Sequence, residues 1–239
     1  MNRKEWAPLT AEAVGTFLFF FVGAGAVVLS DYPTPGSGGG GLVGVALAHG
    51  LVLGVLVSAL GAVSGAHFNP AVTFGVWIAG RITAARAIQY VLAQLVGALI
   101  AGLALRAVFA DPVWQPSSIG TPALGTGIGV ATGIAIEAVL TMVLLFAVFG
   151  TAIDPRAPKI GGLAIGLAIA ADILMGGPLT GAAMNPARWF GPAVASGHLD
   201  NWFVWIIGPL IGAAVAAAIY RGVLAEDADL ARTPASPEA

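Results

Sequence analysis

The sequence predicts an all-α integral membrane protein, with six transmembrane helices and two re-entrant half-helices arranged as an inverted repeat. Three observations lead to this fold class. The 239-residue chain is 58% hydrophobic and only 9% charged, with a mean hydropathy of +0.91, whereas soluble domains carry about 25% charged residues. Six long apolar segments follow one another along the chain, and a short motif containing Asn-Pro-Ala occurs twice.

The six apolar segments approach or exceed the length of about 20 residues that a helix needs to cross a bilayer, the fifth being the shortest. Clusters of Gly, Pro and Asp separate them, and Gly176-Gly177-Pro178 predicts the end of the fifth segment. The segments cover residues 9–30, 42–63, 84–109, 128–149, 160–175 and 202–223.

The twin motif predicts two half-helices. In both Asn69-Pro70-Ala71 and Asn185-Pro186-Ala187 the Asn is placed to cap a helix and the Pro to occupy its first position. The apolar run behind each motif reaches only about 10 residues, which corresponds to about half of a bilayer core. Two half-helices in corresponding places of a repeated chain point to a transport site near the midplane.

The repeat extends beyond this motif. The first span of each half carries a similar stretch, Glu12-Ala13-Val14-Gly15-Thr16 and Glu137-Ala138-Val139-Leu140-Thr141. The last span of each half carries another, Gln94-Leu95-Val96-Gly97-Ala98 and Pro209-Leu210-Ile211-Gly212-Ala213. Three spans lie between the two half-helices, so the halves insert with opposite polarity. We therefore divide the chain into a first repeat (residues 1–110), a second repeat (111–225) and a polar cytoplasmic tail (226–239) that we expect to be disordered.

Most of the Lys and Arg residues fall on one side of this predicted topology. Arg81 and Arg86 follow the first half-helix, and Arg156 and Lys159 join the fourth and fifth spans, whereas the opposite connections, residues 31–41 and 110–127, contain neither residue type. By the positive-inside rule, both termini are predicted to be cytoplasmic.

The two half-helices supply the predicted chemistry. Where their amino ends meet, the peptide dipoles and free N–H groups concentrate positive potential. Asn69 and Asn185 then offer side-chain donors to a passing neutral solute. Such a site repels cations, including protons, and orients an acceptor such as a water oxygen.

These motifs resemble those of the aquaporin, or major intrinsic protein, family. The resemblance rests on the twin Asn-Pro-Ala motifs, on His67 before the first, on Arg188 after the second, and on Glu12 and Glu137. It implies a right-handed bundle with a pore in each protomer, a homotetramer in the lipid bilayer, and passive conduction of water.

The resemblance also places an outer selectivity filter on His49, Ile173, Ala182 and Arg188. Strict water channels of the family usually have Phe, His, a small residue and Arg there, and glycerol facilitators have Trp, Gly, Phe and Arg. The present set resembles the tonoplast intrinsic branch, which conducts water and, in some members, ammonia, urea or hydrogen peroxide. We expect a channel for water and small neutral solutes such as ammonia, with a glycerol facilitator as the alternative.

Further residues receive individual expectations. His67 is expected to line the cytoplasmic half of the pore, with capping of the re-entrant loop as the alternative. Glu12 and Glu137 are expected to accept hydrogen bonds from the loops before the half-helices. Asp172 is expected to pair with a donor behind the pore wall, or else to polarise His49. Trp189 matches neither family pattern.

Several functional classes find no support in the sequence. With no cysteine and three widely spaced histidines, there is no thiol nucleophile and no metal-ligand cluster. No phosphate loop accompanies the intramembrane carboxylates, so neither an enzyme nor a cofactor is expected. The chain has no basic patch for nucleic acid.

Two rival classes remain open. One is a secondary active transporter, since inverted repeats and broken helices occur there too. The other is a structural membrane protein with a closed pore. For location, the short termini and the composition favour a prokaryotic plasma (inner) membrane, and the tonoplast-like filter makes the vacuolar membrane the alternative.

Overall fold

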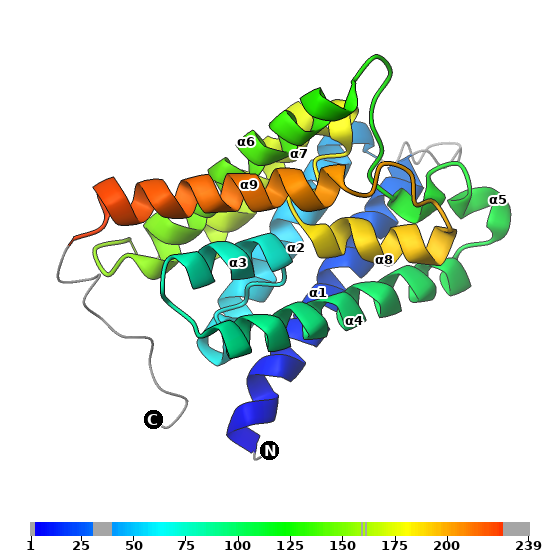
Figure 1. The fold of residues 1–239 in the computed structure, drawn as a ribbon. Helices are drawn as coiled ribbons and strands as arrows, with labels where there is room; N and C mark the ends of the chain where they lie inside the picture. The colour runs from blue at the N-terminus through cyan, green and yellow to red at the C-terminus, as the bar shows by residue number, and fades with distance from the viewer. Residues whose placement is uncertain (1–2, 31–39, 159, 161, 227–239) are drawn as a thin grey trace.

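The computed structural model describes residues 3–30, 40–158, 160 and 162–226, and every regular element within them is helical (Figure 1). Within these residues, nine α-helices are joined by one 3-10 turn, η1, and two π turns, η2 and η3. In chain order they are α1 (Arg3–Ser30), α2 (Gly41–Ser64), α3 (Pro70–Ile78), α4 (Ala84–Val108), α5 (Asp111–Trp114), η1 (Ser118–Gly120), α6 (Val130–Val148), η2 (Phe149–Ile153), α7 (Leu163–Thr180), α8 (Pro186–Ser196), α9 (Val204–Ile219) and η3 (Tyr220–Leu224).

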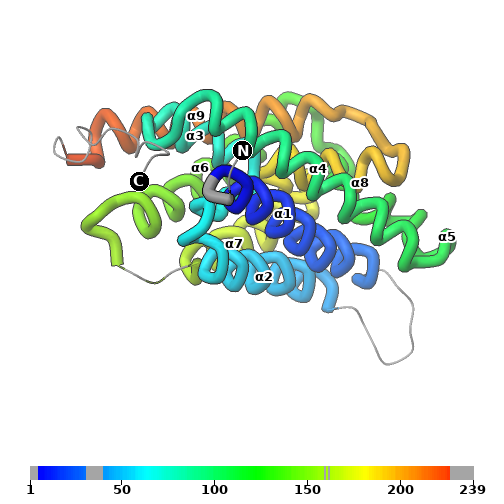
Figure 2. The backbone as a smooth tube through the Cα atoms, turned by 90° about the horizontal axis from the view of Figure 1, so that it is seen from below, coloured from blue at the N-terminus to red at the C-terminus, as the bar shows by residue number. Residues whose placement is uncertain are grey.

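Six of these helices are long and apolar enough to cross a membrane: α1, α2, α4, α6, α7 and α9, with η2 and η3 prolonging α6 and α9. Large apolar side chains such as Val55, Leu92 and Val139 are exposed on the outside of the bundle, where lipid would cover them. The tube drawn in Figure 2 shows the spans lying roughly alongside one another. The predicted fold class is confirmed.

The two short helices α3 and α8 lie between α4 and α9 (Figure 1). Helix α3 packs mainly against α9, and α8 packs mainly against α4. Each half-helix therefore rests on the last span of the other half, which interlocks the two halves. The exact division at residues 110 and 111 stays a prediction.

Two glycines explain why the last span of each half carries the same short motif. A Cβ on Gly97 of α4 would collide with the carbonyl oxygen of Ala13 on α1, and a Cβ on Gly212 of α9 would collide with that of Ala138 on α6. Only glycine allows these backbones to approach so closely. The matched glycines thus fix the same helix contact twice.

The predicted end of the fifth span at Gly176-Gly177-Pro178 is wrong, because α7 continues to Thr180. A proline inside a helix removes one backbone donor, but other contacts hold this last turn. The backbone N–H of Gly125 donates to Leu179 O at 2.8 Å, and Trp205 Nε1 donates to Thr180 O at 3.0 Å. Helix α5 and turn η1 were likewise not predicted, because the sequence there reads only as a Pro-rich connection.

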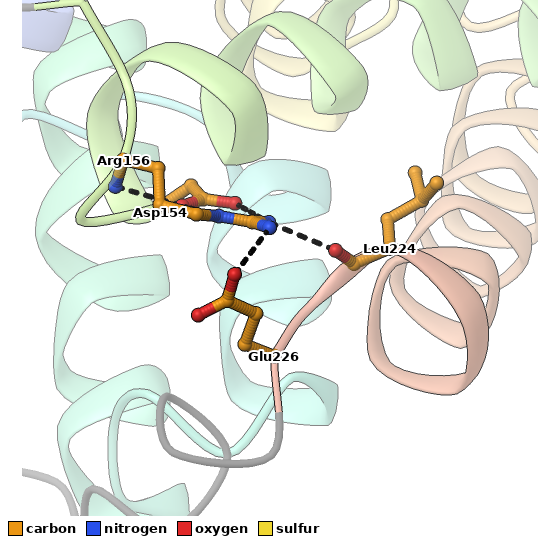
Figure 3. Close-up of polar contacts among 4 residues, drawn as sticks. All are labelled: Asp154, Arg156, Leu224 and Glu226. Atoms are coloured by element: carbon orange, nitrogen blue, oxygen red, sulfur yellow. Dashed lines mark hydrogen bonds and ion pairs between the residues drawn. The ribbon is translucent and has the colours of Figure 1, made fainter.

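The predicted cytoplasmic arginines meet at one end of the bundle. Arg221 donates to Ile78 O at the end of α3, at 2.7 Å. Figure 3 shows Arg156 joining Asp154, Glu226 and the carbonyl of Leu224, with Nη1 3.1 Å from Glu226 Oε1 and Nη2 2.9 Å from Leu224 O.

The Arg156 contact also changes the chemistry of its neighbour. Hydrogen bonds from the Arg156 side chain and backbone lower the pKa of the Asp154 carboxyl to about 2. The tail predicted to be disordered lies outside the described residues beyond Glu226, as do Lys159 and the side chains of Arg3 and Lys4.

Candidate functional site

The amino ends of α3 and α8 meet and are joined by two asparagines. Asn69 Oδ1 accepts from the backbone N–H of Ala71 at 2.8 Å, and Asn185 Oδ1 accepts from that of Ala187 at 3.0 Å. Each Nδ2 then crosses to the other loop: Asn69 donates to Met184 O at 2.9 Å, and Asn185 donates to Phe68 O at 3.0 Å. Pro70 and Pro186 stand at the first position of their helices. Since a side-chain amide carries two N–H groups, each asparagine keeps a second donor.

The loops that lead into both half-helices are strained in the same way. Ala66, Phe68, Ala182 and Met184 all have φ between 45° and 52°, a conformation that costs a non-glycine residue about 1–2 kcal/mol. Such strain persists only where the surroundings hold the backbone in place. Two buried carboxylates provide that support.

The first carboxylate, Glu12 of α1, accepts four hydrogen bonds. They come from Ser64 Oγ at 2.7 Å, His67 N at 2.9 Å, Phe68 N at 2.7 Å and Gln94 Nε2 at 2.8 Å. Two of the donors belong to the backbone of the strained loop. The side chain therefore fastens the loop that places Asn69.

The second carboxylate, Glu137 of α6, repeats this arrangement for the second loop. It accepts from Thr180 Oγ1 at 2.7 Å, Ala183 N at 2.9 Å and Met184 N at 2.6 Å. Ser64 and Thr180, the last residues of α2 and α7, are thus equivalent donors. They were not singled out from the sequence, although each directly precedes a glycine, Gly65 or Gly181, that lies four residues before the asparagine of its motif.

Two of the residues predicted to form the outer filter, His49 and Arg188, contact each other. Arg188 Nε donates to His49 Nε2 at 3.1 Å, and Arg188 Nη1 donates to Gly120 O at 2.8 Å. Because a guanidinium can only donate, His49 Nε2 must carry a lone pair. The imidazole is therefore neutral, with its proton on Nδ1, which lies 2.9 Å from Val45 O. The sequence did not single out Gly120.

The other two residues predicted for the filter, Ile173 and Ala182, are both buried. Ile173 of α7 and Arg188 line one cavity of about 610 Å³, together with the outer connection around residues 116–123. Ala182 packs against Gly176 of α7, because a Cβ built on Gly176 would lie only 3.3 Å from the Cβ of Ala182. The side chains of Ile173 and Ala182 add no donor or acceptor.

A second cavity of about 290 Å³ reaches the asparagines from the side of the arginines predicted to be cytoplasmic. His67, Asn69, Asn185 and Arg81 are among its lining residues. His67 Nδ1 lies 3.1 Å from Thr73 Oγ1, and its ring meets that of Tyr90 edge to face. We call this space the inner cavity and the one beside Arg188 the outer cavity.

Comparison with known proteins identifies the family behind this geometry. A sequence model described as "Major intrinsic protein" matches residues 2–220. The chain belongs to the major intrinsic protein family. Two curated relatives within it are Aquaporin TIP4-4 of Zea mays, 47% identical over 89% of this chain and 84% of the relative, and Probable aquaporin TIP3-2 of Arabidopsis thaliana, 46% identical over 88% and 81%.

A solved structure agrees with the fold. The X-ray structure of the aquaglyceroporin from Plasmodium falciparum superposes with a TM-score of 0.77 at 23% identity, covering 92% of this chain and 96% of that one. The predicted resemblance to the major intrinsic protein family is confirmed. The chain is accordingly a passive membrane channel, and the family to which it belongs consists of channels rather than enzymes.

Two other residues singled out from the sequence are Asp172 and Trp189. Asp172 does not find the predicted donor: it is buried, and its Oδ2 is enclosed without a hydrogen-bond partner among the described residues. Trp189 packs away from both cavities, with its ring stacked on that of Trp205 at a centroid distance of 6.0 Å and an interplanar angle of 7°. Its unusual identity therefore concerns packing between α8 and α9.

Proposed function

We propose that the chain is a bidirectional channel for water that also passes small neutral solutes, ammonia first among them, and excludes protons and ions. The observation that carries this proposal is the meeting of two half-helix starts at Asn69 and Asn185. Helix dipoles and the spare amide donors turn the oxygen of a passing water molecule toward the two asparagines. This orientation interrupts the continuous chain of hydrogen-bonded water molecules along which a proton could move.

The filter supports the passage of solutes other than water. Arg188 is a fixed donor and a barrier to cations, and two of its five N–H groups bind His49 and Gly120, which leaves three for a permeant. Ile173 and Ala182 contribute an apolar wall and space instead of a further donor. In this proposal His49, Ile173, Ala182 and Arg188 form the outer filter.

The rival functions receive less support. In a glycerol facilitator, aromatic residues of the filter are expected to pack against the carbon backbone of glycerol, but the four proposed filter positions hold neither Trp nor Phe. A proton-coupled transporter needs carboxylates that are free to titrate. Both oxygens of Glu12 and of Glu137 are engaged by donors that hold the loops. Of the three buried acidic residues in the described part of the chain, this leaves only Asp172 with an unbonded oxygen, and a single carboxyl group makes no relay.

The assembly and the membrane are also proposals. We propose a homotetramer, with both termini cytoplasmic. The sequence favours a prokaryotic plasma membrane over a vacuolar one, but the relatives described above are plant aquaporins with TIP names and give that choice no support. We therefore restrict the proposal to an integral membrane protein, with the vacuolar membrane as the location that these relatives favour.

Stopped-flow measurements on proteoliposomes test the proposed permeants. Water movement is followed by light scattering, and ammonia entry by an internal pH dye. We expect both to exceed those of empty liposomes. In Ile173→His, which adds a ring and a polar group to the filter, ammonia entry should fall while water movement persists. Leu199→His, the same type of change on an exposed outer loop, is the control. Ammonia entry that stays unchanged in Ile173→His contradicts the assignment of the filter.

A further inference from the structure

The ring of His67 is held by a buried hydroxyl group. His67 Nδ1 lies 3.1 Å from Thr73 Oγ1, and Thr73 is fully buried. Gln94 Nε2 donates to the same oxygen of Thr73 at 2.9 Å, and to Glu12 Oε2 at 2.8 Å. The side chains of Glu12, Gln94, Thr73 and His67 therefore form one chain of hydrogen bonds.

The carboxylate at one end of this chain sets the direction of the bonds. Both oxygens of Glu12 accept hydrogen bonds from the re-entrant loop, so the amide group of Gln94 must face the carboxylate with its nitrogen. An amide nitrogen carries two N–H groups. One of them points to Glu12 and the other to Thr73. The hydroxyl oxygen of Thr73 is therefore an acceptor toward Gln94.

The single hydrogen of the Thr73 hydroxyl group is then left for the imidazole. Among the described residues, Thr73 Oγ1 bonds only to Gln94 Nε2 and His67 Nδ1. A buried O–H that has an acceptor within reach is normally bonded to it. Thr73 accordingly donates to His67 Nδ1, which must carry a lone pair. The proton of the neutral ring is then on Nε2.

His67 Nε2 opens onto the inner cavity. His67 is only partly buried and is one of the residues that line this cavity. Its Nε2 has no hydrogen-bond partner in the part of the chain that the structure describes, yet it is not among the enclosed polar atoms there that lack one. A Cβ built on Gly65, another lining residue, would lie 3.3 Å from this nitrogen. A solute in the inner cavity can therefore reach it.

We propose that Thr73 and Gln94 are positioning residues that fix the Nε2–H form of His67, and that this N–H binds the lone pair of a permeant. This role rests on the proposed channel function. His49 has the opposite tautomer, and its Nε2 is occupied by Arg188. Arg188 thus supplies donors on the outer side of the asparagines, and His67 supplies one on the inner side. No proton is transferred, because the N–H only donates a hydrogen bond.

Nitrogen NMR of the full chain with isotopically labelled histidine reads the tautomer directly. The variant His67→Phe identifies the signals of His67 among those of the three histidines. At about pH 8, where an unperturbed imidazole is neutral, we expect the proton on Nε2 in the wild type. Thr73→Val, which removes the hydroxyl group, should shift the ring toward the Nδ1–H form, and Thr73→Ser should restore Nε2–H. Thr141→Val, which removes a buried hydroxyl group bonded to Glu137 O, is the matched control.

Water permeability of proteoliposomes tests the role of the N–H group. Loss of one hydrogen bond to the permeant predicts a fall of about two- to tenfold in Thr73→Val and in His67→Phe. If Thr73 acts through His67, adding Thr73→Val to His67→Phe lowers the permeability no further. Thr73→Ser should recover most of the loss, and Thr141→Val should conduct like the wild type.

The outcomes separate the positioning of the ring from the channel function. A wild-type ring with its proton on Nδ1 overturns the proposal, and so does an Nε2–H form that persists in Thr73→Val. A further fall in permeability when Thr73→Val is added to His67→Phe also overturns it, because Thr73 would then support the pore by another route. The wild-type spectrum decides on the tautomer even where a variant does not fold. A wild type that conducts no water contradicts the channel function, and the spectra still decide whether Thr73 fixes the ring.

Discussion

Replacing Glu137 by Gln tests whether a single carboxylate holds the second re-entrant loop. The wild-type side chain accepts from Thr180 Oγ1, Ala183 N and Met184 N in a fully buried position. Glutamine offers one acceptor oxygen instead of two, so at least one buried backbone N–H loses its acceptor. An unsatisfied buried donor costs about 1–3 kcal/mol. For a chain of this length that corresponds to a fall in melting temperature of roughly 2–12 °C.

The assay is thermal unfolding of the detergent-purified protein, followed by size-exclusion chromatography of the fraction that stays folded. Asp200→Asn on the exposed outer loop is the control for the chemical change. Glu137→Ala removes all three acceptor contacts and should cost more than Glu137→Gln. Since the loop positions Asn185 and Arg188, water permeability should fall in both variants. If Glu137→Gln melts with the control and conducts like the wild type, the carboxylate does not hold the loop.

Three further predictions follow from other contacts. His49→Ala removes the acceptor of Arg188 Nε and shortens a side chain of the proposed filter, so urea entry measured by light scattering should rise several-fold, and unchanged urea entry would contradict the filter role of His49. Because the pKa of Asp154 is lowered to about 2, the stability gained from its bonds with Arg156 is present above about pH 4 and is lost only as the pH falls through about 2. The difference in melting temperature between the wild type and Asp154→Asn should therefore be constant from about pH 5 to pH 8. A difference that varies across that range would contradict the lowered pKa of Asp154. Trp189→Phe deletes an indole N–H that has no partner among the described residues and shortens a buried ring stacked on Trp205, so the loss of stability should reflect packing alone, about 1–3 kcal/mol; a larger fall in melting temperature would contradict this.

Most of the fold could be predicted because its signals are local and repeated. Runs of apolar residues define the spans, and the Asn-Pro pair contains within itself the cap and the first turn of each half-helix. The geometry of Asn69 and Asn185 follows from that chemistry. The matched glycines Gly97 and Gly212 were noticed as part of a repeat, but their reason, contact with a carbonyl on another helix, appears only in three dimensions.

The sequence failed where distant parts of the chain decide the outcome. Pro178 reads as a helix breaker, yet bonds from Gly125 and Trp205 keep the last turn of α7 helical. The resemblance to the family suggested filter positions for His49 and Arg188, but it did not show that the two side chains bind each other. That contact fixes the imidazole tautomer and occupies the lone pair on His49 Nε2.

The central claim is that this chain conducts water past the two asparagines while it excludes protons. The most direct measurement records osmotic shrinkage and proton entry on the same wild-type proteoliposomes at several temperatures. We expect water movement well above that of empty liposomes with a weak dependence on temperature, and proton entry no faster than in empty liposomes. Water movement equal to that of empty liposomes, or proton entry that rises together with it, would contradict the account.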